Sequence, residues 1–257
     1  MSHTLKNKRA LVTGGSRGIG TGIVNRLASE GADVAFTYSS SPDRAKEVLQ
    51  AAQTLGVRAS AIKADSANAS SVVASVERTV AELGGIDILV NNVSVLAIAR
   101  IDELTLADFD RTIDVNVRAV FVATQAAVKH MKEGGHIINI GSTNAERMPF
   151  TGGSIYAMSK SALQGLAKGL ARDLGPRGIT INNVQPGPIT TDMNPPEGEF
   201  AQMLKKLMAL PRYGTVEEIA GMVAYLASPE AAFITGANLT IDGGFSAYSS
   251  LRSKQPQ

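Results

Sequence analysis

The chain alternates between short apolar runs and longer stretches whose apolar residues recur at helical spacing. Such an alternation is typical of repeated strand–helix–strand units around a parallel sheet. We therefore predict an α/β fold: a doubly wound, seven-stranded parallel sheet with helices on both faces. Strands are predicted at residues 9–13, 33–38, 58–64, 86–91, 136–141, 179–184 and 238–241. Helices are predicted at residues 18–30, 42–55, 68–84, 106–132, 154–175 and 215–228.

The pattern continues without a shift in composition, so we predict one domain over residues 1–245. One segment departs from the rhythm. Pro195 and Pro196 come before an amphipathic stretch that lies too far from the sheet pattern to be a crossover helix. We interpret residues 193–212 as a lid over the site. Residues 246–257 lose all periodicity, and we expect a C-terminal tail there.

Composition narrows the classes of function. The chain carries 25 Lys and Arg against 23 Asp and Glu, a net charge of +2, which gives no general attraction to nucleic acid or anionic lipid. It has no cysteine, its first residues lack the apolar core expected of a signal peptide, and no apolar run comes near the roughly 20 residues that span a bilayer. His3, His130 and His136 have no companions at ligand spacing, so we expect no metal site. These features predict a soluble, cytoplasmic protein without nucleic acid or membrane partners.

A glycine-rich turn, TGGSRGIG at residues 13–20, joins the first predicted strand to the first predicted helix. Gly14 permits a tight turn, Gly18 lets backbone N–H groups approach a phosphate, and Gly20 lets the helix pack closely on the strand. This placement after a strand and before a helix is typical of a Rossmann-type dinucleotide site.

The same turn also fits the G-x-S-x-G nucleophile elbow, which likewise lies between a strand and a helix. Ser16 would then be the nucleophile of a hydrolase, and only His130 or His136 would remain as its base. An elbow on the very first strand would be unusual, so we favour the dinucleotide site.

The end of the second predicted strand indicates which dinucleotide binds. Such sites usually carry an acidic residue about 20 residues beyond the glycines, where it accepts hydrogen bonds from the ribose hydroxyls. This chain has Tyr38, Ser39 and Ser40 there instead. A 2′-phosphate would meet no repelling carboxylate, Arg17 would supply positive charge, and the serine hydroxyls could donate hydrogen bonds. We therefore predict NADP(H) as the cofactor.

Tyr156 and Lys160 are one helical turn apart in the helix predicted at residues 154–175. A free phenol has a pKa of about 10, and a nearby ammonium favours the phenolate. Ser142 and Thr143 follow the fifth predicted strand, at the edge where open α/β sheets bind ligands. Tyr156 could pass a proton to a carbonyl oxygen as a nicotinamide delivers hydride, while a serine hydroxyl binds the developing oxyanion. This chemistry is that of a carbonyl reductase.

With these features in place, the chain resembles the short-chain dehydrogenase/reductase family over nearly its whole length. The motifs that carry the resemblance are TGGSRGIG at 13–20, ADS at 64–66, NNVS at 91–94, DVNVRAVF at 114–121, INIGS at 138–142, YAMSK at 156–160, VQPGPITTDM at 184–193 and TGANLTIDGG at 235–244. The resemblance implies an NADP-dependent oxidoreductase with a small carbonyl or alcohol substrate. Members of the family are commonly tetramers, so we expect a homotetramer or homodimer.

The resemblance also implies roles for single residues. Tyr156 matches the proton donor, Lys160 the group that lowers its pKa and binds the nicotinamide ribose, and Ser142 the group that binds the substrate oxygen. Asn116 matches the asparagine that holds a water in the proton relay. The turn, the second strand and the resemblance together predict these cofactor-binding residues: Gly14, Ser16, Arg17, Gly18, Ile19, Gly20, Tyr38, Ser39, Ser40, Asp65, Ser66, Asn91, Tyr156, Lys160, Pro186, Gly187, Ile189 and Thr191.

Two positions depart from the family pattern. The family usually has N-N-A-G where this chain has Val93 and Ser94, so side chains lie where the backbone passes the cofactor, and we expect a lower affinity. The family also tends to place its serine thirteen residues before the tyrosine, which is the position of Thr143 here, whereas Ser142 is fourteen away. We choose Ser142, because it follows Gly141 at the strand end, and keep Thr143 as the alternative.

Some stretches, notably RMP at 147–149 and VQPGPI at 184–189, are most similar to a bacterial subset of the family that includes a cyclic-di-GMP-binding biofilm-dispersal protein. This resemblance implies an alternative function, a nucleotide sensor that binds cyclic di-GMP with little or no turnover. The intact set of Asn116, Ser142, Tyr156 and Lys160 favours the enzyme, because a pure binder has no chemical need for all four.

Overall fold

A computed structural model describes residues 4–247, so all but two residues of the predicted tail lie outside the described part of the chain. Parallel strands form one sheet in the order β3-β2-β1-β4-β5-β6-β7. They are β1 (Arg9–Val12), β2 (Asp33–Tyr38), β3 (Ala59–Lys63), β4 (Ile88–Asn91), β5 (His136–Ile140), β6 (Thr180–Pro186) and β7 (Asn238–Ile241). The strand order reverses between β1 and β4, as in Rossmann-type sheets. The predicted fold class is confirmed.

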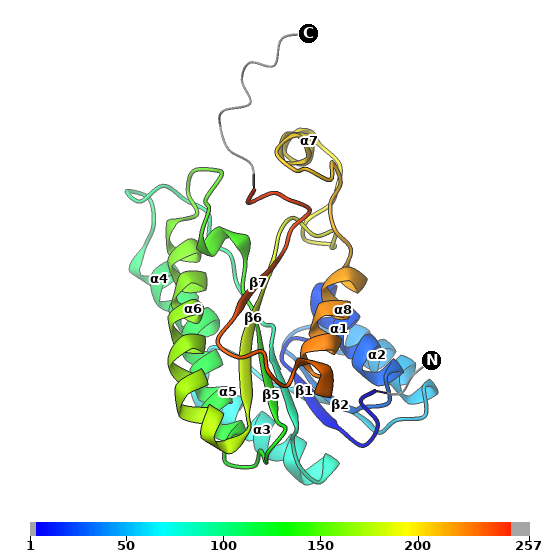
Figure 1. Cartoon of the computed structure of the whole chain (residues 1–257). Coiled ribbons are helices and arrows are strands. Elements are labelled where there is room, and N and C mark those ends of the chain that lie inside the picture. The colour runs from blue at the N-terminus through cyan, green and yellow to red at the C-terminus, as the bar shows by residue number, and fades with distance from the viewer. Residues whose placement is uncertain (1–3, 248–257) are drawn as a thin grey trace.

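Helices cover both faces of this sheet (Figure 1). The α-helices are α1 (Gly18–Ser29), α2 (Pro42–Thr54), α3 (Ala69–Leu83), α4 (Leu106–Ile113), α5 (Ala119–Ala127), α6 (Ser154–Leu174), α7 (Glu199–Lys206) and α8 (Val216–Leu226). Single turns are η1 (Asp114–Arg118), which is π-helical, and the 3₁₀ turns η2 (Thr143–Ala145), η3 (Gly175–Arg177) and η4 (Pro229–Ala231). One layer contains α1, α2 and α8, and the opposite layer contains α3, α5 and α6.

Successive residues of the strands alternate between these two layers. Ala10 and Val12 of β1 pack with α1, α2 and α8, whereas Leu11 packs with α3, α5 and α6. The residues of β4 and β5 divide in the same way. Because both faces of the sheet are buried, the central strands are continuous apolar runs in the sequence.

The helix predicted at residues 106–132 is interrupted. The α-helical pattern stops at Ile113, η1 follows, and α5 ends at Ala127. A π-helical turn adds a residue to the helix and is frequent at functional sites. Here the turn contains Asn116, which is buried and bonded to the loop after β4. Hydrophobic spacing gave no sign of this insertion, so the prediction of one continuous helix was wrong.

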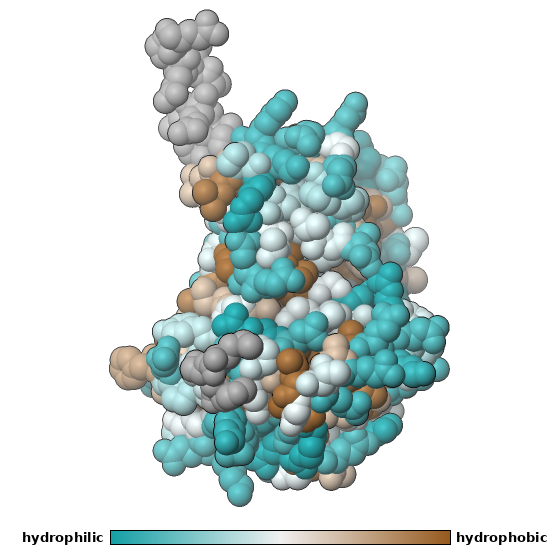
Figure 2. All heavy atoms as spheres, turned by 90° about the vertical axis from the view of Figure 1, so that its right-hand side faces the viewer, coloured by the Kyte–Doolittle hydropathy of each residue, from teal (hydrophilic) through white to brown (hydrophobic). Residues whose placement is uncertain are grey.

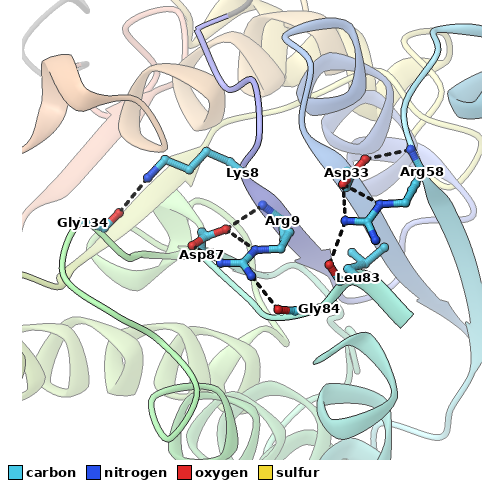
Figure 3. A network of polar contacts seen from close by, with 8 residues as sticks. All are labelled: Lys8, Arg9, Asp33, Arg58, Leu83, Gly84, Asp87 and Gly134. Atoms are coloured by element: carbon cyan, nitrogen blue, oxygen red, sulfur yellow. Dashed lines mark hydrogen bonds and ion pairs between the residues drawn. The ribbon is translucent and has the colours of Figure 1, made fainter. Parts of the chain in front are cut away.

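Charged pairs join the amino ends of four strands (Figure 3). Arg9 donates to the Asp87 carboxylate through Nε at 2.7 Å and Nη2 at 2.8 Å, which joins β1 to the start of β4. Arg58, just before β3, donates through Nη2 to Asp33 Oδ2 of β2 at 2.7 Å. These pairs fix the strands at the edge opposite their carboxyl ends, so they support the sheet without entering the site.

An asparagine ladder crosses the other half of the sheet, and the sequence analysis did not predict it. Asn91 of β4 donates through Nδ2 to Asn139 Oδ1 of β5 at 2.9 Å. Asn139 donates to Asn183 of β6 at 2.9 Å, and Asn183 donates to Asn238 of β7 at 2.7 Å. The four residues share one register, and the first three are buried. A buried, mutually satisfied network of this kind specifies which strands pair.

The predicted lid at residues 193–212 contains α7, which lies beyond the layers of the sheet in Figure 1. Ala201, Leu204 and Met208 of this segment form a small apolar cluster with Tyr213 and Phe245. Hydrophobic residues are also visible in the hollow between the upper part of the molecule and its body in Figure 2. A groove therefore separates this segment from the sheet.

Candidate active site

A first cavity of about 320 Å³ lies at the carboxyl edge of the sheet, between the β1–α1 turn and the ends of β2 and β3. The segment Thr191–Met193 borders it on the lid side. It brings together these predicted cofactor residues: Gly14, Ser16, Arg17, Gly18, Ile19, Gly20, Tyr38, Ser39, Asp65, Ser66 and Thr191. Residues distant in sequence thus meet where the strand order reverses, as expected for a ligand site of an open α/β sheet.

The glycines of the turn are required by its geometry. Gly14 has φ +69°, in the left-handed region that favours glycine. A Cβ at Gly20 would lie 2.1 Å from the carbonyl oxygen of Gly14, so only glycine lets α1 begin this close to β1. The turn therefore holds backbone N–H groups and a helix N-terminus at the cavity, an arrangement that binds phosphate.

The wall formed by the end of β2 carries no carboxylate. Tyr38 and Ser39 line the cavity, whereas Ser40 is exposed and does not line it. Arg17 contributes positive charge from the neighbouring turn. Arg44 forms an exposed ion pair with Asp192, which bridges α2 and the segment that leads to the lid. The polarity of this wall suits a phosphate better than a free ribose hydroxyl pair.

A second cavity of about 340 Å³ adjoins the first. Its polar lining includes Ser142 and Thr143 after β5, and Tyr156 and Lys160 of α6. Pro186, Gly187 and Ile189 border it after β6. The residues that line both cavities are Ile19, Asn92, Ser94, Val95, Thr191 and Met193. A ligand longer than either cavity can therefore extend from one into the other.

Tyr156 lies in the first turn of α6, and Lys160 lies one turn along on the same face. Lys160 is 3% exposed, and its Nζ donates to the carbonyl oxygen of Ile140 at 2.8 Å. The same Nζ lies 5.7 Å from the centre of the Tyr156 ring. Tyr156 as a whole residue is intermediate in exposure and lines the second cavity.

Burial shifts the pKa of both groups toward their neutral forms. It raises the pKa of Tyr156, and hydrogen bonds with the side chains of Ser142 and Ser94 oppose that shift. It lowers the pKa of Lys160 to about 8. Burial outweighs these hydrogen bonds in the net shift of the Tyr156 pKa. The lowering of that pKa by Lys160 stays a prediction.

Asn116 lines neither cavity, but it fixes the loop that does. Its Oδ1 accepts from the backbone N–H of Val95 at 2.8 Å, and its Nδ2 donates to the Val95 carbonyl at 2.9 Å. Nδ2 also donates to Ser159 Oγ of α6 at 3.0 Å. Asn116 thus connects the π-helical turn, α6 and the loop after β4.

Ser142 and Thr143 both line the second cavity, but their hydroxyls differ in position. Ser142 hydrogen-bonds with Tyr156, and its Oγ also accepts from the Asn144 N–H at 3.1 Å. Thr143 donates to the Pro186 carbonyl at 3.3 Å, in contact with the backbone after β6. These contacts favour Ser142 as the partner of Tyr156.

Two predicted cofactor residues do not line either cavity. Ser40 is exposed beyond the end of β2, and the Asn91 side chain belongs to the asparagine ladder. The next residue, Asn92, lines both cavities. Sequence reasoning missed Asn92; strand alternation contained the signal, because adjacent residues of a strand point to opposite faces.

The hydrolase alternative receives no support from the described residues. A nucleophile elbow is a strained turn, yet the only positive φ outside glycine among residues 4–247 belongs to Asn7. His130 bonds to Glu77, and His136 lies at the amino end of β5, bonded to Thr180. Neither histidine is placed to act as a base for Ser16.

A family model described as enoyl-(acyl carrier protein) reductase matches residues 14–246. The chain is also 62% identical to a short-chain dehydrogenase/reductase from Serratia marcescens, whose structure matches with a TM-score of 0.94 over 95% of this chain and 100% of that one. The chain belongs to the short-chain dehydrogenase/reductase family. The resemblance inferred from the motifs is confirmed.

Two further members of the family are similar over almost their full length. A short-chain dehydrogenase from Burkholderia cenocepacia, solved in complex with NADP, is 52% identical, with a TM-score of 0.93 over 95% of this chain and 99% of that one. The cyclic-di-GMP-binding biofilm dispersal mediator protein of Escherichia coli is 51% identical over 240 residues, which are 93% of this chain and 98% of that protein.

Within residues 4–247, no three side chains among His, Asp and Glu are grouped so that they could hold a metal ion. In that same range no helix is both long and apolar enough to cross a membrane.

Proposed function

We propose that this protein is an NADPH-dependent carbonyl reductase, which converts a ketone or aldehyde to an alcohol. One observation carries the proposal: the hydroxyls of Tyr156 and Ser142 and the buried amine of Lys160 line one cavity, beside a cleft with the features of a dinucleotide site. A proton donor and an oxyanion binder thus stand together where the two cavities meet.

The first cavity fits NADP(H). The close approach of Gly20 to Gly14 exposes backbone N–H groups for a pyrophosphate, and Arg17 and Ser39 are placed for a 2′-phosphate. Asp65 and Ser66 would lie by the adenine, and Tyr156 and Lys160 by the nicotinamide ribose. Pro186, Gly187, Ile189 and Thr191 would border the carboxamide. When bound, this cofactor supplies the hydride. NADP is also the cofactor in the Burkholderia complex.

The chain's own residues handle the proton. Tyr156 would donate its Oη proton to the substrate oxygen as that oxygen gains negative charge. Ser142 would donate a hydrogen bond to the same oxygen, and Lys160, cationic below its pKa of about 8, would offset the charge left on the phenolate. Asn116 keeps the loop after β4 in place.

The second cavity favours an uncharged substrate. Lys160 is the only charged side chain among the described residues that line it, and the wall away from Tyr156 is apolar. Phe150 and Phe200 meet there edge to face, with ring centres 5.8 Å apart. Lys205 of α7 does not line this cavity, and its Nζ donates to the Pro196 carbonyl at 2.7 Å. We infer an apolar or aromatic ketone or aldehyde, bound under the lid.

The test is NADPH oxidation, followed by absorbance, with a panel of aliphatic and aromatic ketones and aldehydes. Turnover of uncharged carbonyl compounds, with NADPH preferred to NADH, supports the proposal. A panel without any turnover, under conditions where NADPH binding is measured directly, contradicts it.

The alternative function is a sensor that binds cyclic di-GMP with little or no turnover. Similarity to the Escherichia coli protein supports it. Calorimetric titration of cyclic di-GMP into the protein, with and without NADPH, separates the two. Tight binding without carbonyl turnover favours the sensor, whereas turnover without binding favours the reductase.

We also propose that the protein is a homodimer or homotetramer. Ile113, Val117, Phe121 and Leu166 line a third, open cavity of about 790 Å³ on the outer side of α5 and α6, and Phe121 is 46% exposed. A second copy would cover this apolar face. Light scattering after size exclusion measures the mass, and a monomer at micromolar concentration contradicts this assembly. The cytoplasmic location stays a prediction from the sequence.

A further inference from the structure

A hydroxyl that the family pattern does not include stands beside Tyr156. Ser94, in the loop after β4, lines both cavities. Its Oγ donates to Asn116 Oδ1 at 3.2 Å, and its side chain also hydrogen-bonds with Tyr156. One serine hydroxyl therefore reaches two partners that belong to different elements, η1 and α6.

The loop does not need this hydroxyl to keep its shape. Asn116 already holds Val95 through two bonds, of 2.8 Å to the N–H and 2.9 Å to the carbonyl. The contact between Ser94 Oγ and the Val95 carbonyl is 3.5 Å long, at the limit of a hydrogen bond. The Ser94 hydroxyl is therefore free to respond to the charge on Tyr156.

A hydroxyl has one proton, so Ser94 can donate to only one partner at a time. While Tyr156 is a neutral phenol, the phenol O–H is available to the substrate, and the Ser94 proton lies on Asn116 Oδ1. After Tyr156 has given up its proton, the phenolate is the better acceptor, because hydrogen bonds to a charged group are about twice as strong. Rotation about the Cβ–Oγ bond of Ser94 then moves the hydrogen bond without breaking any covalent bond.

We propose that Ser94 is a switchable donor, which turns from Asn116 to Tyr156 and stabilises the phenolate that the proton transfer leaves. This inference rests on the proposed function, because it assumes that Tyr156 is the acid. It gives a reason for a serine where the family usually has glycine: the added hydroxyl offsets part of the cost of burying the phenolate. Lys160 is the charged residue of α6 that lines the second cavity, while Arg17, Asp65, Arg111 and Asp192 border the first cavity.

The test compares Ser94→Ala, which removes the hydroxyl and keeps the Cβ, with Ser94→Thr, which keeps a hydroxyl. Ionisation of Tyr156 is followed by tyrosinate absorbance in a pH titration with saturating NADP⁺. The same titration of Tyr156→Phe is subtracted to remove the other tyrosines. We expect Ser94→Ala to raise the apparent pKa of Tyr156 by about one unit or more, and Ser94→Thr to leave it nearly unchanged.

Kinetics give a second readout. With a carbonyl substrate, the pH profile of kcat for Ser94→Ala should shift in the same direction as the tyrosinate titration, while the Kd for NADPH stays close to that of the wild type. Titration curves of Ser94→Ala and wild type that coincide overturn the proposal. A shifted titration in a protein that reduces no carbonyl compound supports the role of Ser94 and refutes the reductase, so the two failures are distinguishable.

Discussion

The ammonium of Lys160 lies 5.7 Å from the centre of the Tyr156 ring but donates its hydrogen bond to the Ile140 carbonyl. The two groups therefore share a cavity without a direct bond. The hydroxyls of Ser142 and Ser94, and not the amine, are the direct partners of the phenol. In the proposed function Lys160 would act on Tyr156 through its charge, so removal of either group should have a separate effect.

Replacement of Tyr156 by phenylalanine should remove turnover and leave cofactor binding nearly intact. The substitution deletes one oxygen from a side chain that is partly exposed to the cavity, so the fold keeps its packing. Loss of a general acid lowers rates by roughly 100-fold to 10,000-fold. The measurements are kcat with a responsive ketone and the Kd for NADPH by fluorescence titration.

Tyr225→Phe is the matched control. Tyr225 lies on α8 and is 41% exposed, away from both site cavities. It should keep the wild-type kcat. Substantial residual turnover in Tyr156→Phe, or an equal loss in Tyr225→Phe, would remove Tyr156 as the acid.

Introduction of an acid at the end of β2 should shift the preference from NADPH toward NADH. Ser39 lines the first cavity, so the carboxylate of Ser39→Asp would repel a 2′-phosphate and accept hydrogen bonds from free ribose hydroxyls. A lost hydrogen bond to a charged group costs about 1.5 kcal/mol or more, so kcat/KM for NADPH should fall by about tenfold or more.

The neighbouring serine tests whether position matters. Ser40 is exposed and does not line the cavity, so Ser40→Asp adds the same charge farther from the cofactor. Its effect on the ratio of NADPH to NADH efficiency should be much smaller. A larger effect at Ser40 than at Ser39 would contradict this account of the first cavity.

Much of the fold was predictable because strands that are buried on both faces are continuous apolar runs in the sequence. Strands β2 and β7 coincide with their predicted runs, and the other strands differ from theirs by one or two residues at one or both ends. The π-helical turn at Asp114–Arg118 was not predictable, since it depends on bonds between Asn116 and a loop that is distant in sequence. Spacing within a helix contains no information about such a tertiary contact.

The site was predictable where backbone geometry demands a residue type, as at Gly14 and Gly20. It was less predictable where a side chain had two possible uses. Asn91 matched a family position, but the strand register places it opposite Asn139, to which its amide donates in the asparagine ladder. The pKa of Tyr156 depends on burial, which no spacing reveals.

The asparagine ladder should contribute strongly to stability. Asn139 is fully buried and bonded on both sides, so Asn139→Leu would leave Asn183 Oδ1 without its donor and Asn91 Nδ2 without one of its acceptors. Each buried polar group left without a partner costs about 1–3 kcal/mol. We expect a loss of roughly 2–4 kcal/mol in the free energy of unfolding, measured by urea denaturation.

Asn238 provides the comparison, because it lies at the partly exposed end of the ladder and accepts from Asn183. Asn238→Leu should cost clearly less than Asn139→Leu, since water can replace its contribution. Equal costs at the two positions would mean that the ladder does not act as a buried network.

Stability should fall steeply between about pH 6.5 and pH 4 because of His136. Burial, and next the positive charge of Lys8, lower the pKa of this histidine from 6.5 to about 4, although Asp87 opposes the shift. In that window the unfolded chain binds a proton that the folded protein does not, so acid favours unfolding. Above pH 6.5 His136 is neutral in both the folded and the unfolded chain, and it costs the fold no stability. As the pH falls from 6.5 toward 4, proton binding by the unfolded chain lowers the free energy of unfolding. A shift of this size corresponds to roughly 3 kcal/mol.

Urea denaturation at several pH values measures this dependence. His136→Asn should flatten the curve between pH 6.5 and pH 4, because the amide cannot take up the proton yet can still bond to Thr180, the present partner of His136 Nδ1 at 2.9 Å. His130→Asn is the matched control and should keep the slope, since His136 remains in place. If the curves of His136→Asn and wild type stay parallel through this range, then His136 is not the group whose protonation destabilises the fold.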